Sequence, residues 1–111
     1  MGTLSLPLRV ALPSTVAAGE VVSLRLLLQH PMETGYRLGE DGARIPRQII
    51  QSLRVYYADR CLADLTLQPA ISANPYFAFS FIADRSGPVR IEIQDDQERQ
   101  LTDVRELTVV P

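Results

Sequence analysis

The sequence predicts an all-β fold, namely an immunoglobulin-like antiparallel β-sandwich of about seven strands. Three observations predict this fold. Apolar residues recur with period two rather than about 3.6, turn-forming residues separate the runs at short intervals, and no segment shows a convincing helical pattern. Since 111 residues suit one domain, we expect residues 1–111 to form a single sandwich.

The first four runs each have one apolar side. Residues 6–12 carry leucine or valine at every even position, and Pro7 marks an edge strand because proline donates no ladder hydrogen bond. Residues 20–29 carry four valine or leucine residues at even positions, opposite serine and arginine. In residues 53–57 leucine, valine and tyrosine alternate with arginine and tyrosine, and in residues 61–67 cysteine, alanine and two leucines share one side. Each run therefore predicts a strand with one buried face.

The last three runs repeat this pattern. Three phenylalanines line one side of residues 77–81, and in residues 89–93 valine and two isoleucines alternate with arginine and glutamate. In residues 106–109 leucine and valine alternate with glutamate and threonine. The Asn-Pro pair at 74–75 and the Ser-Gly-Pro triplet at 86–88 supply turns before two of these runs.

Composition and charge exclude several classes of function. The eleven basic residues are all arginine and stand against thirteen acidic ones, so the net charge is −2 and the sequence predicts no nucleic-acid binding, which needs a basic patch. Without lysine the chain has no Schiff-base nucleophile. No stretch approaches the roughly 18 apolar residues of a membrane span. One histidine and one cysteine build neither a structural zinc site nor an internal disulfide, and we expect no metal and no cofactor.

We also expect no catalysis by this chain alone. His30 and Cys61 are the one available imidazole–thiol pair. The alternation places Cys61 on the apolar side of its strand, where we expect a buried and inert thiol. Asp95 and Asp96 are adjacent in sequence, so we expect their side chains to point apart instead of facing each other across a pocket, as general acid–base catalysis requires.

Three loop segments carry residue types suited to binding a partner. Residues 30–35 read His-Pro-Met-Glu-Thr-Gly and follow directly from a strand. Residues 45–50 read Ile-Pro-Arg-Gln-Ile-Ile and enter the third strand, and Arg37, Arg44 and Arg47 cluster along this connection, where they can pair with carboxylates or anions. Residues 72–76 read Ser-Ala-Asn-Pro-Tyr, in which Asn-Pro favours a turn. The candidate interface residues in these segments are His30, Met32, Glu33, Arg37, Arg47, Asn74 and Tyr76.

Each segment also has an alternative interpretation. A lone histidine at a strand end commonly bonds the backbone of its own loop, and arginines balanced by Glu40 and Asp41 form an ordinary solvated loop. Asn74 can simply shape the turn into a core strand. In a third alternative His30, Met32 and Cys61 form a small soft-metal site, because their side chains are ligands that copper accepts.

The order of the strands predicts where the three segments lie. In an antiparallel sandwich built from seven consecutive strands, each connection reverses the chain direction, so the connections after the second, fourth and sixth strands emerge at the same end. These connections are residues 30–46, 68–75 and 95–100. Since binding residues concentrate on loops held by a rigid scaffold, we expect partner contact at this end.

Taken together, these segments resemble one protein family. The motifs that carry the resemblance are Gly-Glu-Val-Val at 19–22, His-Pro-Met-Glu-Thr-Gly at 30–35, Ile-Pro-Arg at 45–47, Ser-Ala-Asn-Pro-Tyr at 72–76 and Ser-Gly at 86–87. In this order and spacing the sequence resembles the SoxZ family over about residues 8–110.

The resemblance implies a non-catalytic subunit of the SoxYZ sulfur carrier in thiosulfate oxidation. In that family the partner SoxY carries sulfur intermediates on a cysteine near its C-terminus, on a flexible Gly-rich arm, and the complex visits the other Sox enzymes in turn. Members lack their own export signal and reach the periplasm bound to SoxY, so the resemblance implies a periplasmic heterodimer. Cys61 has no Gly-rich arm around it and is therefore not expected to be the carrier cysteine.

An alternative of another class is a free-standing immunoglobulin-like binding or adhesion module, which would form a stable chain without such a partner. Apart from its partner, the chain is expected to expose an apolar patch, because the mean hydropathy is high for a soluble chain of this size and some runs are apolar on both faces. The isolated chain is therefore expected to self-associate.

Overall fold

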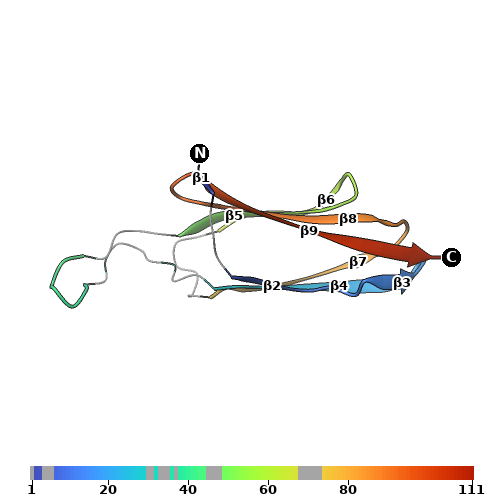
Figure 1. The fold of residues 1–111 in the computed structure, drawn as a ribbon, viewed down its shortest axis with the longest axis horizontal. Helices are drawn as coiled ribbons and strands as arrows, with labels where there is room; N and C mark the ends of the chain where they lie inside the picture. The colour runs from blue at the N-terminus through green and yellow to red at the C-terminus, as the bar shows by residue number, and fades with distance from the viewer. Residues whose placement is uncertain are drawn as a thin grey trace.

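The structure, a computed structural model, describes residues 2–3, 7–29, 32, 36, 38–44, 49–67 and 74–111. Within these residues the chain is a two-layer β-sandwich (Figure 1), and none of them forms a helix long and apolar enough to cross a membrane. The strands are β1 (Gly2–Thr3), β2 (Leu8–Ala11), β3 (Thr15–Ala17), β4 (Val21–Leu28), β5 (Ile50–Tyr57), β6 (Arg60–Thr66), β7 (Tyr76–Ile82), β8 (Gly87–Asp95) and β9 (Arg99–Val110). The predicted all-β sandwich is confirmed.

The two layers differ in size. The larger sheet has the order β1-β9-β8-β5-β6, with β3 also paired to β9, and the smaller sheet has the order β2-β4-β7. All neighbours are antiparallel except β1 and β3, which both run parallel to β9. The N-terminal segment therefore changes sheets twice, because β2 pairs with β4 between the two short contacts with β9.

The seven predicted runs correspond to β2 and to β4 through β9. The two additional strands, β1 and β3, have two and three residues, which are too few to show an alternating pattern. β9 is longer than its predicted run, because its first half has only half-buried apolar residues and the alternation there is weak.

The core lies between the two sheets and is built from the alternating apolar positions. In β4 the side chains of Val22, Leu24, Leu26 and Leu28 are at most 1% exposed, and the residues between them face outward. Burying each such side chain contributes about 1.5–3 kcal/mol relative to leaving it in water. The facing core residues of the larger sheet are Leu53, Val55, Val89, Ile91, Ile93 and Leu107.

Tyr57 closes the core at the end of β5. Its ring is buried and lies 4.8 Å from the ring of Phe81, measured between centroids. Its hydroxyl accepts hydrogen bonds from the amides of Asp84 (3.1 Å) and Arg85 (2.9 Å) and donates to the Arg85 carbonyl. The hydroxyl thereby ties the β7–β8 connection to the end of β5.

The prediction that Cys61 is buried is wrong. A β-bulge interrupts the β5–β6 pairing, so that Val55 lies opposite Ala63 but Tyr56 lies opposite Cys61. Leu62 is the extra residue and packs against the core, whereas Cys61 moves to the outer face and is exposed. Strict alternation cannot reveal such a shift, because one inserted residue exchanges the two faces of a strand.

Candidate interaction site

The three predicted connections leave the sandwich at one end, as the strand order predicts. Ile50 at the start of β5 pairs with Asp95 at the end of β8, and Leu27 near the end of β4 pairs with Tyr76 at the start of β7. In Figure 1 this is the end from which the segment Leu38–Arg44 projects away from the two sheets. We call this region the loop end.

Met32 anchors the long connection to the body of the protein. It has a φ of 51°, in the left-handed region, and its side chain is 5% exposed within the core cluster. Its sulfur accepts a hydrogen bond from the Ile50 amide at 3.3 Å. The side chain of this predicted interface residue is therefore unavailable at the surface, and Met32 can influence a partner only through the position of its loop.

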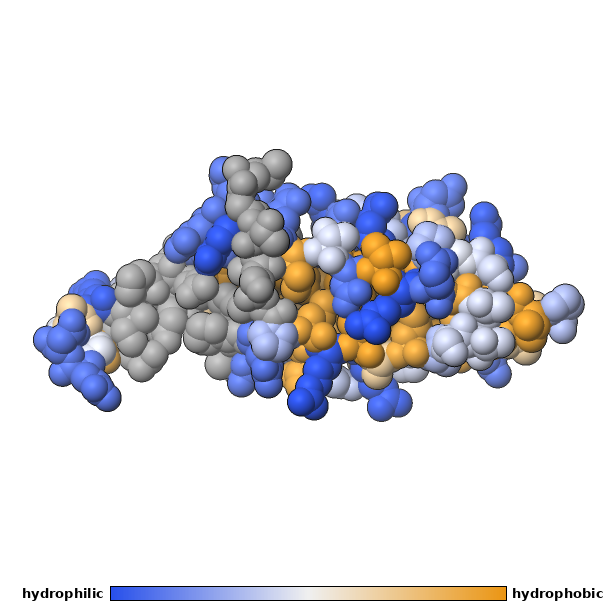
Figure 2. All heavy atoms as spheres, viewed as in Figure 1, coloured by the Kyte–Doolittle hydropathy of each residue, from blue (hydrophilic) through white to orange (hydrophobic). Residues whose placement is uncertain are grey.

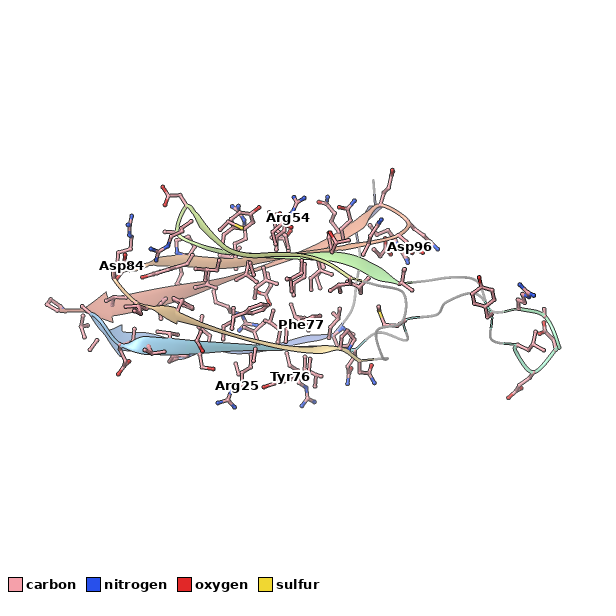
Figure 3. All side chains as sticks on the ribbon, turned by 180° about the vertical axis from the view of Figure 1, so that it is seen from behind. Arg25, Arg54, Tyr76, Phe77, Asp84 and Asp96 are labelled. Carbon is pink, nitrogen blue, oxygen red and sulfur yellow. The ribbon has the colours of Figure 1, made fainter. Side chains whose placement is uncertain are left out.

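The two adjacent aspartates shape the β8–β9 turn. The fully buried Asp95 carboxylate accepts hydrogen bonds from the amides of Gln97 (3.0 Å) and Arg99 (2.8 Å) and forms an ion pair with the Arg99 guanidinium at 2.7 Å. These bonds offset the cost of burying its charge. Asp96, labelled at this turn in Figure 3, exchanges hydrogen bonds with the backbone of Ile49, which ties the turn to the residue just before β5. The prediction that the two carboxylates do not face each other is confirmed.

Asn74 and Tyr76 lie where the third connection enters β7. Asn74 is exposed and has a φ of 53°, a conformation that asparagine tolerates better than most residues. Pro75 is buried, and its carbonyl accepts a hydrogen bond from the Leu28 amide at 3.1 Å. The Tyr76 side chain is 59% exposed and points away from the core on the same side as Arg25, whereas Phe77 points between the sheets (Figure 3).

The other four predicted interface residues, His30, Glu33, Arg37 and Arg47, lie outside the described residues. Their part in an interface stays a prediction. In the described part of the long connection, Leu38 forms a β-bridge with Arg44, and the Arg44 guanidinium lies 5.8 Å from the centre of the Tyr36 ring. Tyr36 and Leu38 are among the most exposed large apolar side chains described.

The alternative of a soft-metal site that includes both Met32 and Cys61 is wrong. Met32 contacts Ile50 at the start of β5, whereas Cys61 lies opposite Tyr56 near the other end of that strand. Six residues of extended strand separate these positions by about 20 Å. Among the described residues no three histidine, cysteine, aspartate or glutamate side chains gather in a group that could hold a metal ion.

The outer face of the smaller sheet was not singled out from the sequence, although alternation alone places its residues. The residues of this face, which we call the small-sheet face, are Arg9, Ala11, Val21, Ser23, Arg25, Leu27, Tyr76, Ala78, Ser80 and Ile82. A shallow hollow of about 220 Å³ lies on it, lined by Arg9, Val10, Ala11, Arg25, Leu27 and Tyr76. Because Tyr76 lines this hollow and also lies at the loop end, the hollow adjoins the loop end.

Charge is balanced differently on the two outer faces. On the larger sheet Arg54 pairs with Asp64 at 3.4 Å and Arg90 with Glu92 at 3.2 Å, and Asp64 raises the pKa of Arg54. On the small-sheet face neither Arg9 nor Arg25 forms an ion pair with any described residue, and the face contains no acidic side chain.

Comparison with known proteins gives one family. The sequence profile of the family described as "Sulphur oxidation protein SoxZ" matches residues 10–105. No curated protein sequence matches the chain.

Several solved structures share the fold at low sequence identity. The sulfur carrier protein SoxY from Chlorobium limicola f thiosulfatophilum is 14% identical, with a TM-score of 0.66 over 96% of this chain and 87% of that chain. The superoxide reductase (neelaredoxin) from Ignicoccus hospitalis is 16% identical, with a TM-score of 0.67 over 93% and 80% of the two chains. A PKD domain of an M14-like peptidase from Thermoplasmatales archaeon SCGC AB-540-F20 is 15% identical, with a TM-score of 0.57 over 96% and 98%. At these identities the likeness concerns the fold alone.

Proposed function

Because the chain belongs to the SoxZ family of sulfur-oxidation proteins, we propose that it is the non-catalytic subunit of a SoxYZ carrier complex. In this complex it holds SoxY, and SoxY carries the sulfur intermediates of thiosulfate oxidation on its own cysteine. The observation that carries the proposal is the family match over residues 10–105, which includes all three loop motifs.

The structure around Cys61 favours a scaffolding role for this chain, in which Cys61 does not carry the sulfur intermediates. A carrier thiol must move between enzymes, which requires a flexible segment. Cys61 lies inside β6, where its backbone is held in register opposite Tyr56, and its thiol contacts the Ala63 carbonyl at 3.5 Å. The sulfur cargo therefore belongs on the partner.

We place the complex in the periplasm, where the Sox system typically acts, and we assign the loop end to contact with SoxY or its carrier arm. The geometry supports this assignment because two independent tethers hold the loops. Met32 fixes the long connection to β5, and Asp96 fixes the β8–β9 turn to the same strand. Loops held in this way can present side chains at low entropic cost. Other Sox enzymes would contact the complex transiently through the carrier arm.

Co-purification with SoxY tests the proposal. A tagged form of this chain, expressed with the SoxY of the same organism, should yield a one-to-one complex by native mass spectrometry. The purified chain alone should not turn over thiosulfate, and thiosulfate oxidation by the reconstituted Sox enzymes should require both subunits. A stable lone chain with no affinity for SoxY would refute the proposal and favour a free-standing binding module.

Tyr76→Ala tests the loop end separately. Tyr76 is exposed, so its removal should leave the free energy of unfolding within about 0.5 kcal/mol of the parent value. It should weaken SoxY binding or transfer to the Sox enzymes severalfold. Tyr36→Ala, at a tyrosine that is even more exposed and that contacts Arg44 of the projecting segment, distinguishes the base of the loops from their tip.

A further inference from the structure

The edge strand β7 offers unpaired backbone groups. Among the strands that the structure describes, β7 pairs only with β4, in an unbroken antiparallel register. The Leu28 amide donates to the Pro75 carbonyl at one end of this ladder, and the Ala83 amide donates to the Glu20 carbonyl at the other. Odd-numbered residues therefore bond to β4, and the alternate residues direct their amides and carbonyls away from it. These outward-bonding residues are Tyr76, Ala78, Ser80 and Ile82.

β7 also lacks the usual protection of an edge strand. Its sequence, Tyr-Phe-Ala-Phe-Ser-Phe-Ile, contains no charge and no proline, and no bulge interrupts its register. Long, uncharged edge strands readily pair with other chains, and natural proteins avoid leaving them bare. In Figure 3 β7 lies at the near edge of the smaller sheet, with Tyr76 at the loop end. An edge of this kind can readily pair with a strand of another chain.

Two other sheet edges carry such protection. β2 is only four residues long, carries Arg9, and lies between Pro7 and Pro13. β6 carries Arg60 and Asp64, and its pairing with β5 contains a bulge. Charge, proline, shortness and bulges are the features that discourage strand addition.

The remaining edge, β9, is partly covered and charged. β1 pairs with Arg99 and Gln100 and β3 pairs with residues 108–110, which leaves residues 101–107 without a described neighbour on that side. In that section Asp103 and Arg105 form an ion pair at 3.2 Å, opposite the core residues Ile91 and Val89. Figure 2 shows this side of the molecule, where apolar atoms along the seam between β9 and β2 are interrupted by hydrophilic side chains. Charges directed inward at an edge block further pairing, so β7 is the one described edge without protection.

The side chains beside the β7 edge indicate the charge of what covers it. Arg25 lies directly opposite Ala78 on the small-sheet face, and Arg9 lies one strand further on. Neither arginine pairs with a described carboxylate. A second copy of this chain would bring the same arginines and no acidic residue from this face. A partner with an acidic residue beside its edge strand fits better.

We propose that β7 is the docking strand for SoxY: an edge strand of SoxY pairs with β7 and continues the β2-β4-β7 sheet, with an acidic SoxY side chain facing Arg25. The proposal rests on the proposed function. SoxY suits the role because it shares the two-sheet fold, with a TM-score of 0.66, and so presents edge strands of its own. Backbone bonding supplies affinity in such strand addition, and the flanking charges select the partner.

Amide hydrogen exchange, followed by NMR in the free chain and in its complex with SoxY, tests the proposal without altering the protein. In the free chain the amides of Ala78 and Ser80 should exchange fast, whereas those of Phe77, Phe79 and Phe81 should be protected by β4. In the complex Ala78 and Ser80 should slow by at least about a hundredfold, as ladder amides do. The Thr66 amide, on the bare side of β6, serves as the control and should stay fast.

Two proline variants test the same edge by affinity. Ala78→Pro removes an outward amide and leaves the β4 ladder intact, so it should weaken SoxY binding about tenfold or more. Thr66→Pro does the same on the edge of β6 and should change binding less than twofold. If Ala78→Pro lowers the melting temperature, Ser80→Lys supplies the equivalent disruption through a charge on the edge, and the exchange data remain decisive.

The outcomes separate this proposal from the proposed function. A SoxY complex that forms while Ala78 and Ser80 still exchange fast refutes the docking strand and leaves the function standing. Failure of the unaltered chain to bind SoxY refutes both, because SoxY is the named occupant. Protection of Ala78 that appears in the chain alone as its concentration rises identifies a second copy as the occupant and also refutes the proposal.

Discussion

The two sheets of this protein treat their outer arginines in opposite ways. On the larger sheet Arg54 and Arg90 each pair with a carboxylate of the same sheet. On the smaller sheet Arg9 and Arg25 have no acidic partner among the described residues, and β7 beside them carries no charge. The outer arginines of the larger sheet are thus neutralised by carboxylates of the same sheet. On the smaller sheet, Arg9, Arg25 and the outward backbone groups of β7 have no such partner among the described residues. In the proposed complex the smaller of the two layers is the one that meets the partner.

The chain order explains this asymmetry. Residues 1–60 contain seven arginines and five acidic residues, and residues 61–111 contain four arginines and eight acidic residues. β2 and β4 of the smaller sheet come from the first part, and β6, β8 and β9 of the larger sheet come from the second, whereas β5 and β7 do not follow this division. Most acidic side chains are thus placed on the larger sheet and its turns, away from Arg9 and Arg25.

If the larger sheet depends on its own ion pairs, the largest effect should come from the buried pair. Asp95→Ala should lower the free energy of unfolding by about 2–4 kcal/mol, because the Arg99 guanidinium and two turn amides lose their acceptor. Urea denaturation measures this change. Glu98→Ala, at an exposed position of the same turn, is the control and should stay within about 0.5 kcal/mol. Equal effects of the two variants would show that Asp95 is not the organising residue.

The smaller sheet should respond in binding rather than in stability. Arg25→Glu should leave the free energy of unfolding within about 0.5 kcal/mol, because no described carboxylate pairs with Arg25. It should weaken SoxY binding about tenfold, since an acidic partner would then meet a like charge. Isothermal titration calorimetry at two salt concentrations measures both affinity and its electrostatic part. Unchanged affinity would show that no acidic SoxY residue faces Arg25, so that only backbone pairing along β7 could hold SoxY.

The exposed pairs of the larger sheet should contribute little. Arg54→Ala should lower the free energy of unfolding only slightly, because both Arg54 and Asp64 are about half exposed and water screens their attraction. The effect should shrink in 1 M salt, where surface charges are screened. SoxY affinity should stay within twofold, so Arg54→Ala is also the matched control for Arg25→Glu. A large loss of binding would show that SoxY contacts the larger sheet and not the smaller one.

The smallest effect should come from Cys61. Since its thiol is exposed, it should react completely with a thiol reagent in the native protein, without denaturant. Cys61→Ala should leave stability within about 0.5 kcal/mol and carrier function of the heterodimer largely intact. Slow labelling would show that the Cys61 thiol is buried after all. If Cys61→Ala folds normally but the heterodimer no longer loads sulfur, Cys61 takes part in the carrier reaction.

Period-two alternation was enough to predict most of the fold, because seven strands each bury one face. It could not predict β1 and β3, whose pairing depends on β9 and not on their own composition. It misplaced Cys61, because a bulge depends on how two strands meet. The convergence of the loops followed from strand parity alone.

The site was predicted less fully than the fold. Tyr76 and Asn74 lie at the exposed start of β7, but Met32 is buried, because a side chain in a loop can turn back into the core without any sign in the sequence. The free edge of β7 was also not predicted. Which strand ends a sheet is a property of the topology, and only the assembled sheet shows that β7 has one neighbour among the described strands.

The parallel contacts of β1 and β3 with β9 have a consequence for biosynthesis. Thr15 pairs with Thr108 and Gly2 with Arg99, so β1 and β3 can pair only after the ribosome has made β9, which lies far along the chain. Contacts between such distant parts of a chain form slowly, because the loop that joins them must be ordered first. The central strands of both sheets can pair during synthesis, but the larger sheet is complete only when β9 has left the ribosome. β7 pairs with none of the described strands of the larger sheet, so the completion of that sheet does not cover its edge, and in the proposed complex early binding of SoxY would shield this edge from other nascent chains.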